Sequence, residues 1–144
     1  MSRITIGRII NAPVDKVFDT VANINQFRQA IPHIVKVEFL SDTKSGVGTR
    51  FRETRLMRGK EVSNDLEVTE YVPNEHVRIV ADTHGTVWDT VFSVRAKDGL
   101  TELTMVMDAR PHKLLPKIMT PLIMPMVTKA IAQDMDSVKA FCEK

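Results

Sequence analysis

Three short turns that end in glycine divide the middle of the chain, and they constrain its fold more than any other feature. They are Arg58-Gly59, His84-Gly85 and Asp98-Gly99, and each lies between two runs rich in β-forming residues. Two-residue turns with Gly in second place favour type I′ hairpins, in which both central residues have a positive φ. The spacing therefore predicts five consecutive antiparallel strands, over residues 48–57, 60–71, 76–84, 86–97 and 100–110.

The same turns predict which residues face each other across the hairpins. In the first hairpin a two-residue loop pairs Phe51 with Leu66 on one face and Arg52 with Asp65 on the other. The other two hairpins follow the same rule, with apolar pairs on the face that Phe51 shares. A slip of one residue would turn every side chain to the opposite face, so the matches support one register. The sheet is thus expected to have one apolar face and one wet face.

The flanking segments complete the order of elements. Residues 3–10 and 34–40 are predicted strands, and between them a helix with an apolar stripe starts at Pro13, followed by a second short helix over residues 23–31. After residue 110 the apolar pattern is helical to the end. This order predicts an α+β helix-grip fold. A seven-stranded curved antiparallel sheet has two short helices after its first strand and a long C-terminal helix across its concave face.

Size and composition predict a single domain over residues 1–144 and exclude several partners. The net charge of +2, with Lys and Arg scattered along the chain, argues against a nucleic-acid partner. The one cysteine, Cys142, cannot form a disulfide within the chain, and no signal peptide is visible at the start. The most apolar window, residues 118–127, is half the length of a membrane span and contains two prolines. We therefore expect a cytoplasmic protein without integral membrane association.

No pattern of catalytic or metal-binding residues is recognisable. None of the four histidines has a partner at helical i, i+4 spacing, and there is no phosphate-binding glycine loop or Gly-x-Ser-x-Gly motif. No metal or cofactor is expected, and no catalytic residue is assigned.

Three polar residues fall on the predicted apolar face. Glu53 and Asn64 oppose each other there, and Arg55 lies two residues along the same face. In one interpretation the sheet frays or bulges, and these groups reach water or one another. In the other, they hydrogen-bond the polar end of a ligand, because unpaired polar groups on an apolar face cost free energy. A carboxylate in such a wall could also act as an acid or a base.

A further pair of charged residues, Asp89 and Asp108, is expected to meet on the outer face of the sheet. Two like charges that face each other are mildly unfavourable, and we expect solvent to absorb this cost.

A curved sheet that grips one helix leaves a gap, which is a natural place for a ligand. Methionines are frequent among the residues expected around it, and they either fill gaps in the core or form a wall that adapts to ligands of varied shape. The candidate cavity-lining residues are Phe51, Glu53, Arg55, Asn64, Leu66, Ile79, Ala81, Trp88, Thr90, Phe92, Met105, Met107, Met119, Ile123, Met126, Val127 and Ile131.

The segment that precedes the last helical turns is rich in proline. Pro116, Pro121 and Pro125 follow one another at intervals that remove helix hydrogen bonds. We therefore expect the start of the C-terminal helix to be broken or mobile, and its apolar side chains to form a lid over the cavity.

The chain resembles the START-like or SRPBCC superfamily of polyketide cyclase/dehydrase and lipid-transport proteins. The similar segments cover the whole chain: Ile10-Asn11-Ala12-Pro13-Val14-Asp15-Lys16-Val17-Phe18 at the entry to the first helix, residues 46–51, residues 68–73, and residues 138–143. The aromatic-proline pair usual after the second helix of that family is Ile31-Pro32 here. The resemblance implies a cavity for a hydrophobic small molecule and does not identify that molecule.

Three classes of function remain open at this point. The first is binding or carriage of a lipid, polyketide or isoprenoid in the cavity. The second is an enzyme of the polyketide cyclase/dehydratase or aromatase type that uses the same cavity. The third is a module that binds a protein or a membrane through residues 111–127, which allows transient contact with a membrane. The sequence assigns no oligomeric state.

Overall fold

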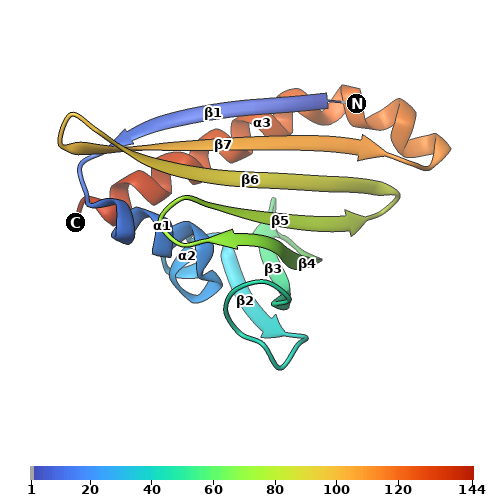
Figure 1. Cartoon of the computed structure of the whole chain (residues 1–144). Coiled ribbons are helices and arrows are strands. Elements are labelled where there is room, and N and C mark those ends of the chain that lie inside the picture. Colours follow the sequence, from blue (N-terminus) through green and yellow to red (C-terminus); the bar gives the residue numbers. More distant parts are fainter. Residues whose placement is uncertain (1) are drawn as a thin grey trace.

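The computed structural model describes residues 2–144 and has the predicted order of elements (Figure 1). The chain starts with β1 (Ser2–Ile10) and two short helices, α1 (Val14–Ala22) and α2 (Ile24–Ala30). Six strands follow: β2 (Ile34–Phe39), β3 (Arg50–Met57), β4 (Lys60–Val72), β5 (His76–Thr83), β6 (Thr86–Lys97) and β7 (Leu100–Pro111). The last element is α3 (Leu114–Cys142).

The strands form one antiparallel sheet in the order β1-β7-β6-β5-β4-β3-β2. The meander from β2 to β7 is therefore continuous, and β1 pairs with its last strand. Long α3 runs along one face of this sheet, and α1 and α2 lie near the C-terminal end of α3 (Figure 1). The helix-grip fold predicted from the turns is confirmed.

The hairpin turns have the geometry that their residues predict. At Arg58-Gly59 the two φ angles are 51° and 78°, and the other two turns have similar positive values. The type I′ assignment fixes the register, so Phe51 pairs with Leu66 and Arg52 with Asp65. Arg52 donates two hydrogen bonds to Asp65, at 2.7 and 3.1 Å, on the exposed face. All three hairpins keep the predicted pairing.

Two irregularities interrupt the ladders away from these turns. The pairing of β2 with β3 shifts between Ile34 and Lys36, and that of β4 with β5 shifts between Val68 and Glu70. An extra residue in one strand bends it and increases the local twist. Both shifts lie in the half of the sheet formed by β2 to β5, so they increase the bend of that half.

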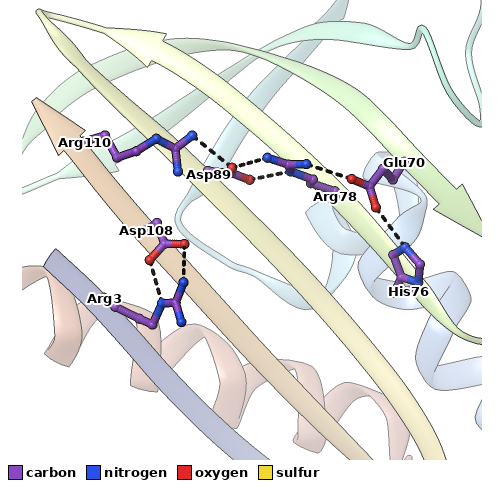
Figure 2. A network of polar contacts seen from close by, with 7 residues as sticks. All are labelled: Arg3, Glu70, His76, Arg78, Asp89, Asp108 and Arg110. Carbon is purple, nitrogen blue, oxygen red and sulfur yellow. Dashed lines mark hydrogen bonds and ion pairs between the residues drawn. The ribbon is translucent and has the colours of Figure 1, made fainter. Parts of the chain in front are cut away.

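The outer face differs from the prediction at Asp89 and Asp108. They do face each other across β6 and β7, but arginines rather than solvent neutralise them (Figure 2). Arg78 donates to Asp89 from Nε at 2.9 Å and from Nη2 at 2.6 Å, and Arg110 donates to it at 3.0 Å. Arg3 donates to Asp108 at 2.7 and 3.1 Å. The expectation was wrong because it considered the facing pair alone, whereas these arginines lie on neighbouring strands or at diagonal positions.

The arginines also change the acidity of both carboxyl groups. Hydrogen bonds from Arg78 hold the pKa of Asp89 below its ordinary value, although burial acts in the opposite direction. The bonds from Arg3 lower the pKa of Asp108 in the same way. Both side chains therefore stay ionised, and the outer face is held together by a chain of ion pairs that extends through Arg78 to Glu70.

The core lies at the end of the sheet that α1 and α2 cover. The rings of Phe18 and Tyr71 meet edge to face with centroids 5.3 Å apart, and those of Phe27 and Phe92 are 6.1 Å apart. The buried residues of α3 are Thr120, Met135, Val138 and Cys142. Three of these four lie in its last turns, so the C-terminal part of α3 enters the core while its first half is mostly unburied.

The predicted break in the C-terminal helix is wrong. Pro121 and Pro125 both lie inside α3, which is continuous over 29 residues. Each proline removes one hydrogen bond to the carbonyl four residues earlier, and Lys117, Pro121 and Pro125 are all exposed. Water can therefore hydrogen-bond the carbonyls of Lys117 and Pro121, which lose their helix partners. The helix continues through both prolines.

Candidate functional site

A pocket of about 940 Å³ lies between the inner face of the sheet and α3. Its walls come from β3 to β7 and α3, with contributions from α1 and α2 at the core end. The structure brings together all of the candidate cavity-lining residues of the sequence analysis around this one pocket. That they contact a ligand remains a prediction.

Most of the wall is apolar and belongs to central strands. Phe51, Leu66, Trp88 and Phe92 line it from the sheet because they alternate with outward-facing residues on their strands. Met105, which is fully buried, and Met107, which is half-buried, continue the same wall on β7. A wall of aromatic and methionine side chains offers a large apolar contact area without fixing the shape of what it contacts.

The polar part of the wall is an ion-pair cluster of Glu53, Arg55 and Asp134. Arg55 donates from Nε to Glu53 and from Nη1 to Asp134, the second bond measuring 2.7 Å. The side chain of Glu53 is 9% exposed and that of Asp134 is 15% exposed. Asn64 pairs with Glu53 across β3 and β4 and also lines the pocket. These strands do not fray here, so the polar groups contact one another and still face the pocket.

Asp134 was missed by the sequence analysis. The apolar stripe of α3 includes Val127, Ile131, Met135 and Val138, and Asp134 falls within it at helical spacing. An acidic residue in such a stripe signals a partner on the opposite wall. Arg55 is that partner, 79 positions earlier in the chain.

The two carboxylates keep the guanidinium of Arg55 charged. Burial acts to lower the pKa of Arg55, but attraction to Glu53 and Asp134 and the hydrogen bonds to them outweigh it and raise that pKa. With one cation between two carboxylates, the cluster carries one net negative charge.

The pocket opens between the β3–β4 hairpin and the first half of α3. Met57, Val62 and Met126 line the pocket and are also exposed, so they form its rim. The Nη2 group of Arg58 at the hairpin tip lies 3.5 Å from the sulfur of Met126. The hairpin and the helix therefore touch across the rim.

The β5–β6 turn, whose residues Thr83, His84 and Thr86 line the pocket, contacts the start of α3. The carbonyl of Gly85 accepts hydrogen bonds from the backbone N–H groups of His112 and Lys113, at 2.8 and 3.3 Å. The hydroxyls of Thr86 and Thr120 lie 3.4 Å apart, and both side chains are buried. These contacts attach the start of α3 to the sheet.

Histidines do not gather at the site. His76 contacts Glu70 on the outer face at 3.1 Å, and His112 contacts Asp82 at 2.8 Å, while His84 alone of the three lines the pocket. Within residues 2–144 no group of three His, Cys, Asp or Glu side chains is arranged to hold a metal ion.

The model of one protein family matches residues 1–143 of the chain. That family is described as polyketide cyclase/dehydrase and lipid transport. The chain belongs to this family. The match covers both the sheet and α3, and therefore the whole pocket of this member of the polyketide cyclase/dehydrase and lipid transport family. No curated protein has a matching sequence.

Solved structures with the same fold have very different sequences. The protein TTHA0849 from Thermus thermophilus is 12% identical with a TM-score of 0.79, over 98% of this chain and 97% of that one. Protein BH1534 from Bacillus halodurans is 16% identical with a TM-score of 0.76, over 99% of this chain and 98% of that one. The di-domain ARO/CYC StfQ from the steffimycin biosynthetic pathway is 11% identical with a TM-score of 0.80, over 98% of this chain and 50% of that one. At these identities the likeness concerns the fold.

Proposed function

We propose that this protein binds and carries an apolar small molecule, of the lipid, polyketide or isoprenoid class, in the pocket between the sheet and α3. The observation that carries the proposal is the pocket itself, whose volume of about 940 Å³ lies in the range of roughly 300–1,000 Å³ that suits small ligands. Its walls are mostly apolar and their acidic residues gather in one cluster, as expected for a ligand with a long or flat apolar body and one polar group.

The state of the charged residues supports binding more than chemistry. A general base must be free to accept a proton, but one oxygen of each carboxylate in the cluster is already held by Arg55. A site built from mutually paired groups is suited to orienting a polar group of the ligand. This favours a carrier over an enzyme.

A second candidate function is that of a polyketide cyclase or dehydratase. Glu53 favours it, because a mostly buried carboxylate beside an apolar pocket is a candidate for proton transfer. The fold shared with the di-domain ARO/CYC StfQ is consistent with this candidate. For such an enzyme, Glu53→Gln would abolish turnover of a polyketide substrate while leaving its binding within a few fold. A carrier would show binding without turnover in both forms.

Native mass spectrometry and fluorescence test the carrier proposal. Protein purified from its own host is expected to retain an apolar molecule, seen as a mass difference between native and denatured spectra. After delipidation, 1-dodecanol is expected to change the emission of Trp88, which is the only tryptophan of the chain and lines the pocket.

A matched pair of variants locates that binding. Thr90 lines the pocket, and its neighbour Val91 points to the other face of β6 at similar burial. Thr90→Phe should weaken the binding of 1-dodecanol at least tenfold, whereas Val91→Phe should leave it unchanged. No co-purified molecule together with no response of Trp88, or equal losses in both variants, would refute the proposal.

A further inference from the structure

The charge of the polar cluster restricts which polar group a ligand can bring into the pocket. Glu53 and Asp134 contribute two negative charges and Arg55 one positive charge. Of the other described residues on the wall, Lys113 is charged, but it precedes Asp134 by 21 positions along α3, a distance of about 30 Å in a helix. It therefore cannot neutralise the cluster.

The cluster also has unused hydrogen-bonding groups. Arg55 reaches Oε1 of Glu53 and Oδ2 of Asp134, which leaves Oε2 and Oδ1 without a hydrogen bond within residues 2–144. Its own Nη2 group is likewise unused there. The site thus offers acceptors and donors close together, in a wall that is mostly apolar. A hydroxyl group can satisfy both, because it donates one hydrogen bond and accepts others.

We infer that the pocket selects an apolar molecule whose polar end is a neutral hydroxyl, as in an alcohol or a phenol, and rejects the corresponding carboxylate. This inference rests on the proposed function and adds the chemical class of the ligand. A carboxylate would place a third negative charge around one guanidinium, in a partly buried site where like charges repel strongly.

Two matched probes test the inference. At pH 7, 2-naphthol is neutral and 2-naphthoate is charged, and both share one ring system. Isothermal titration calorimetry should give at least tenfold tighter binding of 2-naphthol. In Asp134→Asn the cluster becomes neutral, so the affinity for 2-naphthoate should rise at least fivefold. The difference in affinity between the two probes should therefore become smaller. Glu53→Gln is a second variant with the same expected direction, should the first fail to fold.

The control for these variants is Asp136→Asn. Asp136 is exposed, lies outside the pocket lining on the same helix, and pairs with Arg8 at 2.7 Å. Its replacement makes the same change to the net charge and should leave the preference for 2-naphthol unaltered. Equal or tighter binding of 2-naphthoate by the original protein would overturn the inference while the pocket stands as a binding site. Failure of both probes to bind would also overturn the inference, and the response of Trp88 to 1-dodecanol would then show whether the proposed function fails with it.

A second inference rests on a different observation, the exposed face of the first half of α3. Residues 112–133 contain no Asp or Glu, and their charged residues are Lys113, Lys117 and Lys129. Large apolar side chains on this half of the helix are exposed, namely Leu114, Leu115, Ile118, Met119, Leu122 and Met126. An apolar helix face surrounded by basic residues is complementary to a membrane surface that carries anionic lipids.

We propose that this face of α3 docks onto an anionic lipid bilayer. By length and composition alone α3 could also cross a membrane, a property that one helix of a soluble protein can share. Crossing would, however, pull Met135, Val138 and Cys142 out of the core, whereas docking leaves them in place. Leu115, Met119 and Met126 also line the pocket, so docking would bring the pocket rim to the lipid.

Vesicle co-sedimentation tests the docking proposal. Binding to vesicles of equal phosphatidylcholine and phosphatidylglycerol should exceed binding to pure phosphatidylcholine at least threefold, and should fall as salt is raised. The variant Ile118→Ser/Leu122→Ser should lose this binding. The control Leu40→Ser/Val47→Ser removes exposed apolar residues outside α3 and should keep it. Equal sedimentation with both kinds of vesicle would overturn the proposal. So would a dimer, seen by sedimentation velocity, that the α3 variant abolishes, because this face would then bind a second copy of the chain.

Discussion

Asp89 is held by two arginines on the outer face of the sheet, and its side chain is only 6% exposed. Arg78 makes two of the three bonds, and both arginines remain partly in contact with water. A nearly buried carboxylate that loses its charge leaves these donors with a weaker acceptor. The effect on stability should therefore be measurable and should depend on pH.

The substitution Asp89→Asn keeps the shape of the side chain and removes its charge. We expect the free energy of unfolding at pH 7 to fall by about 1.5–3 kcal/mol, the range for a hydrogen bond to a charged group. The pKa of Asp89 in the folded protein lies below its ordinary value of 3.8, so its stabilising contribution is present above that value. This contribution is lost as the pH falls through the folded-state pKa. Urea unfolding should therefore show a smaller difference in unfolding free energy between the original protein and Asp89→Asn in strong acid than at pH 7.

Asp65→Asn serves as the comparison, because Asp65 pairs with Arg52 on the exposed face, where both side chains are about half accessible to solvent. Its effect at pH 7 should be clearly smaller, since exposed ion pairs contribute little. Two results would contradict the account of the outer face. One is an equal loss of unfolding free energy in both variants, and the other is a loss in Asp89→Asn that becomes larger in acid.

Single residues were predictable where their partners lie directly across a hairpin. Arg52 and Asp65 are such a pair, and their bond follows from the register. Arg55 and Asp134 are not, since one is on a strand and the other on a helix whose rotation and depth depend on the packing of the whole protein. Asp89 lies between these cases, because its partners sit diagonally on adjacent strands.

The β5–β6 turn combines a local requirement with a long-range one at Gly85. Its φ of +84° is strained for any residue with a side chain, and a Cβ there would lie 2.9 Å from the side chain of Lys113 at the start of α3. Gly99 has nearly the same conformation, with φ of +80°, but nothing lies within 4 Å of its Cβ position.

Gly85→Ala should therefore be more harmful than Gly99→Ala. Both variants lose about 1–2 kcal/mol of unfolding free energy through the left-handed backbone conformation. Gly85→Ala should lose about 1 kcal/mol more, because Lys113 and the beginning of α3 must shift. Urea unfolding of the two variants measures the difference. Equal losses would mean that the turn does not hold α3 in place.

The prolines of α3 weaken its backbone without breaking it. Alanine is favoured over proline by about 3 kcal/mol in a helix interior, so Pro121→Ala/Pro125→Ala should stiffen the first half of α3. Amide hydrogen exchange over residues 114–127 should slow, and 1-dodecanol should enter more slowly with little change in affinity. Pro111→Ala, which lies at the end of β7, is the control. If amide exchange over residues 114–127 of the original protein is as slow as exchange over residues 128–142, a mobile lid is ruled out.

At the level of the whole chain, the turns predicted the pairing of the middle strands. Each type I′ turn determines its hairpin locally, so the three turns pair β3 with β4 and join β5, β6 and β7, while the loop over residues 73–75 connects these two groups. The depth of the pocket and the path of α3 were not predictable in this way. They depend on the bulges near Ile34 and Val68 and on which part of α3 enters the core.

Core and pocket divide the inner face of the sheet, and this division can be tested with two methionines. Met135 borders the pocket but is fully buried and packs into the core cluster, so Met135→Ala should cost about 2–5 kcal/mol of unfolding free energy. Met107 is half-buried and lies beside open pocket space, so Met107→Ala creates little new cavity and should cost less than about 1 kcal/mol. Thermal and urea unfolding provide the comparison, and similar costs would mean that the pocket wall supports the fold as much as the core does.

This division has an evolutionary consequence. A protein in which one end of the molecule supplies stability and the other end contacts the ligand can change its specificity by mutation without first losing its structure. Proteins that keep this fold at 11–16% identity are consistent with such freedom. On this view, new specificities should arise mainly through substitutions on β3 to β7 and on α3 up to Asp134, whereas α1, α2 and the last turns of α3 should accept few changes.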